Sequence, residues 1–166
     1  EKKIILMPGR LTSWKGQELF IKSIHLVKTE LGYEAFHVVI LGSEQGRDLY
    51  KNKLVNLSKQ YNLSNQIKFI DHCEDMALAY KVSDIVVSAS IEPEAFGRVA
   101  VEAQSMKKLI IASNIGGSNE TIIDGKTGIL FDSGDATSLS KKIIQALTMD
   151  EATIKLIGEE ARKNII

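Results

Sequence analysis

The chain has 166 residues, of which 44% are hydrophobic and 25% are charged, proportions typical of a globular protein that exclude a disordered or low-complexity chain. Its 21 basic and 21 acidic residues cancel, so the net charge provides no general attraction to nucleic acid or to an anionic membrane. The single cysteine, Cys73, excludes an internal disulfide and a cysteine-rich metal site, and it fits a reducing, cytoplasmic compartment.

Short apolar runs alternate with amphipathic stretches along the whole chain, a pattern typical of βαβ units. The runs predict strands at Ile4–Met7, His37–Leu41, Ile67–Ile70, Ile85–Ser88, Leu109–Ala112 and Gly128–Phe131. Helical spacing of apolar residues predicts a first helix that ends at Gly32 and a second with Tyr50, Leu54, Leu57 and Tyr61 on one face. Further helices are predicted at Glu74–Val82, Gly97–Met106, Ser118–Ile123, Ala136–Met149 and Glu151–Lys163. We expect one three-layer α/β domain, with about six parallel strands and helices on both faces.

The loop after the first strand carries two basic residues. Ligands of an open parallel sheet bind beyond the carboxyl ends of its strands, where Arg10 and Lys15 can converge. Gly9 permits tight backbone geometry beside them. Two cations on one loop suit a diphosphate, although a solvated basic loop is the alternative. The loop is not a G-x-x-x-x-G-K-[ST] phosphate loop, because its spacing and its final residue differ.

The loop after the fourth strand carries two carboxylates around a helix start. Gly97 would let the backbone approach a ligand, and the free N–H groups of the helix that begins there suit a phosphate. Glu94 and Glu102 can accept hydrogen bonds from paired sugar hydroxyls. Taken singly, each is explained better by an ordinary role, Glu94 at a helix start and Glu102 on a helix surface. Apolar residues surround Glu102 in the sequence, so we expect its charge to need a partner.

A glycine pair, Gly116–Gly117, follows the fifth strand. It either opens space for a bulky ligand or forms a plain strand-to-helix turn with Glu120 in the first helical turn. His25 and His37 have no carboxylate or thiol at metal-ligand spacing, so both are interpreted as structural.

In this order and at this spacing the chain resembles the retaining family-four glycosyltransferases. The residues that carry the resemblance are Gly9–Leu11, Lys15–Gly16, Phe69, His72, Asp75–Met76, Asp84–Ile85, Pro93–Arg98, Glu102–Ala103, Gly116–Gly117, Glu120, Asp124–Gly128 and Gly134–Asp135. The most specific part is the pair Glu94 and Glu102, which has Phe96–Gly97 between its members. The sequence departs from the family pattern at Asp71 and Cys73, where Gly and Arg are common, and it lacks the usual Gly-x-Pro turn before the fifth strand.

The resemblance implies a GT-B fold, in which two Rossmann-like domains face each other across a cleft. Residues 1–166 would be the C-terminal domain that binds the nucleotide-sugar donor, and the N-terminal acceptor domain would be missing from this chain. We therefore expect an excised segment that does not catalyse transfer alone. The full-length enzyme would transfer a hexose from a UDP-, GDP- or ADP-sugar, with retention, to a glycan or glycolipid of the bacterial envelope such as lipopolysaccharide. It would be cytoplasmic, with peripheral membrane association through the missing domain, and would bind no nucleic acid.

The resemblance also implies roles for individual residues. Arg10, Lys15 and Glu94 would be catalytic: the two cations would grip the diphosphate and stabilise charge on the leaving group, and Glu94 would contact the transferred sugar. The donor-binding set would be Gly9, His72, Cys73, Phe96, Gly97, Val99, Ala100 and Glu102, with Glu102 on the ribose and residues 72 and 73 near the base. No cofactor or metal would be needed, because the cations and a helix terminus replace it.

Three other functions stay open at this point. A sugar-nucleotide epimerase shares the two-domain architecture, although the spacing of Glu94 and Glu102 argues against it. A non-catalytic nucleotide-binding module would bind a nucleoside diphosphate without transferring a sugar. A dinucleotide oxidoreductase is disfavoured, because no G-x-G-x-x-G follows the first strand.

Overall fold

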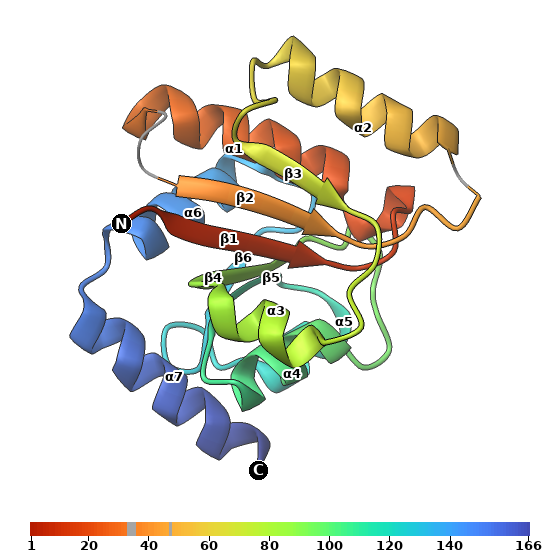
Figure 1. Cartoon of the computed structure of the whole chain (residues 1–166). Helices are drawn as coiled ribbons and strands as arrows, with labels where there is room; N and C mark the ends of the chain where they lie inside the picture. Colours follow the sequence, from red (N-terminus) through yellow and green to blue (C-terminus); the bar gives the residue numbers. More distant parts are fainter. Residues whose placement is uncertain (33–35, 47) are drawn as a thin grey trace.

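One parallel sheet forms the centre of the computed structural model, which describes residues 1–32, 36–46 and 48–166 (Figure 1). Its strands are β1 (Lys3–Pro8), β2 (Phe36–Leu41), β3 (Ile67–Ile70), β4 (Ile85–Ser88), β5 (Leu109–Ser113) and β6 (Ile129–Phe131). Their order is β3-β2-β1-β4-β5-β6, and every pair is parallel. The six predicted strands and the α/β fold class are confirmed. The order reverses direction between β1 and β4, and such a switch point opens a crevice at the carboxyl edge of the sheet.

Helices cover both faces of this sheet. They are η1 (Ser13–Lys15), α1 (Gln17–Leu31), α2 (Asp48–Gln60), α3 (Met76–Val82), α4 (Arg98–Ser105), α5 (Gly116–Thr121), α6 (Ala136–Thr148) and α7 (Glu151–Ile165). In Figure 1 α1, α2 and α6 lie on one side of the sheet, whereas α3, α4 and α5 lie on the other. The helix α7 packs against α4.

Several helix boundaries differ from those predicted from sequence. The helix α3 begins at Met76 rather than Glu74, because the Asp75 side chain caps it by accepting a hydrogen bond from the Leu78 amide at 2.9 Å. The helix α5 begins at Gly116, two residues before the predicted start at Ser118, and the short 3-10 helix η1 was not predicted. Such differences are expected, because capping and loop contacts decide where a helix begins, and apolar spacing does not record them.

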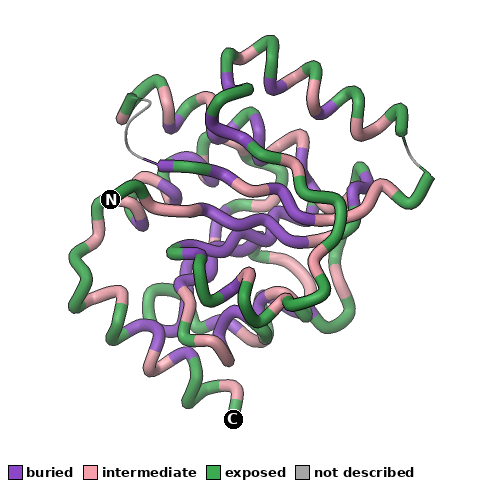
Figure 2. The backbone as a smooth tube through the Cα atoms, in the orientation of Figure 1, coloured by how far each residue is buried: buried purple, intermediate pink, exposed green. Residues whose placement is uncertain are grey.

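The strands bury alternate residues on opposite faces. Ile5 and Met7 of β1 belong to the apolar cluster that contains Phe20 of α1, and Leu6 belongs to the cluster on the other face, with Tyr80 of α3. Every residue of β4 and β5 is buried, as expected for central parallel strands (Figure 2). The helices α3, α4 and α5 each contact a strand of the sheet directly.

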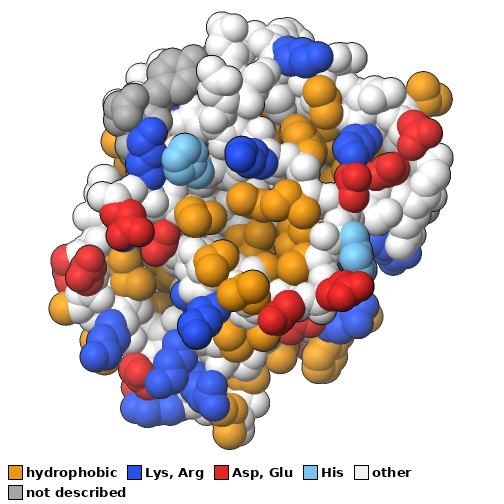
Figure 3. All heavy atoms as spheres, in the orientation of Figure 1, with side chains coloured by type: hydrophobic (Ala, Val, Ile, Leu, Met, Phe, Trp, Pro, Cys, Tyr) orange, Lys and Arg blue, Asp and Glu red, His pale blue; other side chains and the backbone are white. Residues whose placement is uncertain are grey.

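The face seen in Figure 3 mixes charges of both signs with apolar side chains. The exposed apolar residues of the domain include Leu78 and Val82 of α3 and Ile70 at the end of β3. Within the described part of the chain, no helix has the length and apolar character that crossing a bilayer requires.

Close backbone contacts fix the loops at the carboxyl edge. Gly16 has φ +83°, and a Cβ placed on it would lie 1.8 Å from the carbonyl oxygen of Ala89. The Ile91 amide donates a hydrogen bond of 2.9 Å to the Trp14 carbonyl. The loop after β1 is therefore held directly against the segment after β4, and only glycine fits at the point of closest approach.

The glycine pair Gly116–Gly117 does not open space for a ligand; it makes room for another segment of the backbone. A Cβ on Gly116 would lie 2.6 Å from the carbonyl oxygen of Glu94, and one on Gly117 would lie 2.5 Å from the carbonyl carbon of Phe96. The Gly117 amide also donates a 2.7 Å hydrogen bond to the Glu94 carbonyl. The two glycines thus make room for the backbone of residues 93–97 and support that loop from behind.

We expect Gly16→Ala to destabilise the fold far more than Gly125→Ala. Both glycines have a positive φ, but a Cβ on Gly125 would meet nothing within 4 Å. Gly125→Ala should therefore cost about 1–2 kcal/mol, the strain of a left-handed residue. Gly16→Ala should cost about 2 kcal/mol more, because the backbone at Ala89 must move as well. Urea denaturation measures both, and equal losses would contradict the close contact.

Candidate functional site

A cavity of about 520 Å³ lies where the strand order reverses, beyond the carboxyl ends of β1 and β4. Its wall consists of residues 8–10, 14 and 15 after β1, Met76 and Tyr80 of α3, and residues 93–99 and 102 of the loop and helix after β4. Three basic and two acidic side chains line it, which leaves one net positive charge. This is the edge at which the sequence predicted a ligand.

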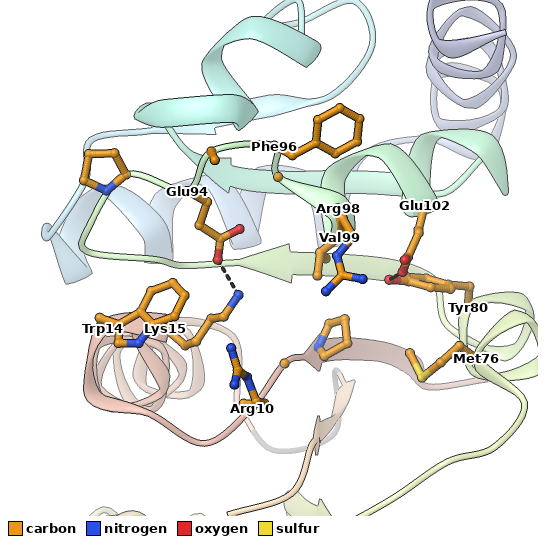
Figure 4. A pocket seen from close by; sticks show the side chains of 15 residues that line it. Arg10, Trp14, Lys15, Met76, Tyr80, Glu94, Phe96, Arg98, Val99 and Glu102 are labelled. Carbon is orange, nitrogen blue, oxygen red and sulfur yellow. Dashed lines mark hydrogen bonds and ion pairs between the residues drawn. The ribbon is translucent and has the colours of Figure 1, made fainter.

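Lys15 and Glu94 meet across the cavity (Figure 4). The ammonium of Lys15 forms an ion pair with Oε1 of Glu94 and lies 4.6 Å from the centre of the Trp14 ring. Ser90 donates a second hydrogen bond to the same oxygen at 2.8 Å. The side chains of Lys15 and Glu94 are 19% and 14% exposed. Their attraction is therefore screened less than that of a surface pair, and it ties the β1 loop to the β4 loop.

Two arginines line the cavity without a protein partner. Arg10 follows β1, and Arg98 is the first residue of α4; both are exposed. Within residues 1–32, 36–46 and 48–166, neither guanidinium forms a hydrogen bond or an ion pair. Sequence reasoning counted Arg98 within the family motif but gave it no role. Its position directly after Gly97, at the predicted helix start, could have indicated that Arg98 lies at the site.

Glu102 has a partner, although its surroundings differ from the prediction. The sequence predicted an apolar environment, but Glu102 is exposed, because the buried side of α4 carries Ala100, Ala103 and Gln104. Its Oε2 accepts a 2.7 Å hydrogen bond from the hydroxyl of Tyr80. Burial, and then this bond to Glu102, hold the pKa of the Tyr80 phenol well above its usual value. The phenol therefore remains a donor throughout the physiological pH range.

The start of α4 presents backbone N–H groups to the cavity. Gly97 caps the helix with φ +64°, and Gly97 and Val99 both line the wall. Phe96 lies at the rim with 66% of its side chain exposed. Ala100 is fully buried and does not line the cavity, so its backbone amide is the group available for the implied role.

His72 and Cys73 lie apart from the residues gathered around the cavity. Both follow β3 at the same edge of the sheet, but neither lines the cavity wall. His72 is exposed, and the Cys73 thiol donates a hydrogen bond of 3.2 Å to the carbonyl of Asp75. Their contact with a base stays a prediction. On this side the cavity is instead bounded by Met76, which belonged to the family motif without an assigned role, and by Tyr80, which the sequence did not single out.

The remaining site residues lie where the sequence placed them. Gly9, with φ +144°, lines the cavity beside Lys15. Trp14 lines it too, and the Lys15 ammonium lies over its ring. Among the residues that the structure describes, no group of three or more His, Cys, Asp or Glu side chains is arranged to hold a metal ion.

We expect the Lys15–Glu94 pair to contribute to stability when no ligand is bound. Glu94→Gln leaves Lys15 near Arg10 without its counter-charge, and this should cost about 1–3 kcal/mol. Lys15→Met should cost a similar amount, and the double variant less than the sum of the two. Urea denaturation of all three variants measures the coupling. Glu159→Gln, which breaks the exposed pair with Lys107, should change little, and additive losses at residues 15 and 94 would contradict a direct interaction.

Comparison with known proteins identifies relatives over nearly the whole chain. The model of the family "Glycosyl transferases group 1" matches residues 1–164. A D-inositol 3-phosphate glycosyltransferase of Corynebacterium glutamicum is 27% identical over 161 residues, which are 96% of this chain and 38% of that protein. The chain therefore spans about two fifths of the length of this relative.

Solved structures of glycosyltransferases are also similar to this chain over nearly its whole length. The crystal structure of a glycosyltransferase from Rickettsia africae is 37% identical, with a TM-score of 0.94, over 99% of this chain and 43% of that one. The structure of Anabaena Alr3699/HepE in complex with UDP and glucose is 26% identical, with a TM-score of 0.89, over 98% of this chain and 43% of that one. Both comparisons place this fold in GT-B glycosyltransferases. The chain belongs to the group 1 family of glycosyl transferases.

Proposed function

We propose that this chain is the donor-binding half of a retaining glycosyltransferase, with residues 1–166 as the C-terminal domain and the acceptor domain outside the chain. The whole enzyme would transfer a hexose from a nucleotide diphosphate sugar to a glycan or glycolipid of the bacterial envelope. The observation that carries the proposal is that Arg10 and Lys15 face Glu94 and Glu102 across one cavity at the switch point of the sheet. The family assignment favours sugar transfer over the epimerase alternative.

The diphosphate would bind between the β1 loop and the start of α4. Arg10 and Arg98, which have no partner among the described residues, bring guanidinium groups that can each form two parallel hydrogen bonds to phosphate oxygens. At about 4 Å and an effective dielectric constant of about 20, one such pair of charges attracts by about 4 kcal/mol. The first N–H groups of α4 add a partial positive charge. We propose that these groups make transfer independent of a metal ion and of any other cofactor.

Catalysis would be largely electrostatic. The bond between the anomeric carbon and the phosphate oxygen would break while an acceptor hydroxyl forms a bond to the same carbon. The hydroxyl would give up its proton, which the leaving phosphate can accept, and negative charge would build up on the nucleoside diphosphate that leaves. Arg10 and Lys15 would stabilise that charge where it develops. Lys15 would turn from Glu94 toward the phosphate, and Glu94, still bonded to Ser90, would accept a hydrogen bond from a hydroxyl of the transferred sugar.

The nucleoside would extend toward α3. Glu102 would accept hydrogen bonds from the ribose, and backbone groups at His72 and Cys73 would meet the base. The structure of HepE with UDP and glucose supports a nucleotide-sugar donor for this chain. We further propose a cytoplasmic enzyme, associated with the inner face of the membrane through the acceptor domain, with no nucleic acid partner. This chain alone should not transfer sugar.

A panel of nucleotides tests the proposal. UDP, GDP, ADP and their sugars would be added to the chain, and thermal unfolding followed by fluorescence. A ligand at a hundred times its Kd stabilises by about 2.7 kcal/mol, which raises Tm by several degrees. We expect one base to be preferred. If none of these nucleotides raises Tm, the proposal is wrong.

The basic residues should act on the diphosphate and not on the nucleoside. Arg10→Ala, Lys15→Ala and Arg98→Ala are each expected to weaken binding of the preferred nucleoside diphosphate by about tenfold or more, since each removes a charged hydrogen bond. Binding of the free nucleoside should change by less than about threefold. Calorimetric titration measures both ligands. Lys141→Ala, which removes an exposed charge on α6, is the control, and equal losses for diphosphate and nucleoside would count against the assignment.

A further inference from the structure

Tyr80 is a cavity residue that the function above does not use. It belongs to α3, and only 2% of its surface is exposed. Its ring packs with Leu6 and Val86 in the apolar cluster beneath the cavity, and its hydroxyl reaches the wall. There the hydroxyl donates to Oε2 of Glu102 at 2.7 Å. Tyr80 thus joins the rigid interior to a carboxylate at the surface.

Glu102 needs such a contact to hold one position. It is an exposed residue in the middle of α4, and a glutamate there has three rotatable bonds. Within the described ranges it forms no ion pair, although Arg98 lies one turn earlier on the same helix. The hydrogen bond from Tyr80 is the contact that orients its carboxylate toward the cavity, as Figure 4 shows.

The hydrogen bond from Tyr80 leaves the Glu102 carboxylate able to accept further hydrogen bonds from a ligand. A carboxylate offers about four lone-pair sites on two oxygens, and Tyr80 occupies one of them on Oε2. Oε1 and the rest of Oε2 remain available to two neighbouring hydroxyls. The 2′ and 3′ hydroxyls of a ribose are such a pair, whereas a 2′-deoxyribose offers one.

We propose that Tyr80 is a positioning residue that fixes Glu102 for a ribose diol, so that the pair selects ribonucleotides over 2′-deoxyribonucleotides. This inference rests on the proposed function, since it needs a nucleotide in the cavity. Tyr80 touches no ligand in this account and acts through Glu102.

The fold does not need the hydroxyl of Tyr80. Ser83 donates to the Tyr80 carbonyl through its amide at 3.2 Å and through its hydroxyl at 2.8 Å, and neither bond involves the side chain of Tyr80. The ring itself supplies the apolar packing. Tyr80→Phe keeps both features, so it removes the hydrogen bond to Glu102 and leaves the domain folded, which a thermal unfolding curve verifies.

The test compares two ligands that differ in one hydroxyl. For UDP, ADP or GDP, whichever binds best, and for its 2′-deoxy counterpart, calorimetry gives the ratio of the two Kd values. The wild-type chain should prefer the ribonucleotide by about tenfold to a hundredfold, the range for a hydrogen bond to a charged group. Tyr80→Phe should reduce this ratio to about threefold or less, because ribonucleotide binding loses two oriented contacts to Glu102 and 2′-deoxynucleotide binding loses at most one.

Two further variants show whether Tyr80 acts through Glu102. Glu102→Gln should also reduce the ratio, and adding Tyr80→Phe to it should change nothing more. Tyr50→Phe is the matched control, because Tyr50 is a half-buried tyrosine whose hydroxyl also donates a hydrogen bond, to Gln17 at 3.3 Å, outside the cavity. It should keep the wild-type ratio.

The possible failures can be told apart. Absence of binding by every nucleotide in the panel would overturn the proposed function, and this inference with it. Binding in which Tyr80→Phe keeps the wild-type ratio, or weakens both ligands equally, would overturn the inference alone. Wild-type binding without a preference for ribose would also overturn it, and would leave the diphosphate site intact.

Discussion

The site depends on the close approach of the loop after β1 to the segment after β4. Gly16 brings the first backbone against the carbonyl of Ala89, and the hydrogen bond from Ile91 to Trp14 joins the two segments at a second point. Without this contact Lys15 and Glu94 would belong to separate loops and would not meet. Because β1 and β4 are adjacent strands whose helices lie on opposite faces, no helix fills the edge between them, and a cavity remains.

The charges in this cavity are arranged so that a bound anion can replace Glu94 as the partner of Lys15. Lys15 is neutralised by Glu94, whereas Arg10 and Arg98 have no counter-charge among the described residues. The cavity thus holds two arginines whose charge a diphosphate would compensate, and a lysine that can exchange a carboxylate for a phosphate. The carboxylates are in turn held by neutral donors, Ser90 for Glu94 and Tyr80 for Glu102. Each acid therefore keeps one contact that does not depend on the ligand.

The sequence predicted the strands well because a buried parallel strand is an unbroken apolar run, and the runs of this chain are separated by clear helical spacing. It also predicted which loops carry the site, since every strand of a parallel sheet ends at the same edge. Arg10, Lys15, Glu94 and Glu102 were found in this way, and the structure brings all four to one cavity. Their roles toward a donor stay proposals.

Other features could not be read from spacing. Tyr80 was not singled out in the sequence. Its ring packs in the core, and the direction of its hydroxyl is set by how α3 packs beside α4. A glycine pair looks the same in the sequence whether it faces a ligand or another backbone segment. The structure shows that Gly116 and Gly117 face the backbone of residues 93–97. Apolar surroundings for Glu102 were predicted from its neighbours in sequence, but a helix turns each neighbour to a different side.

A crystal structure of the chain with bound UDP, or with ADP or GDP if one of these binds better, tests the central claim most directly. The account predicts that the diphosphate lies between Arg10, Lys15 and the first turn of α4, with the ribose against Glu102. A nucleotide bound elsewhere, for example in the separate hollow lined by Thr12, Asp48 and Tyr50, would contradict it.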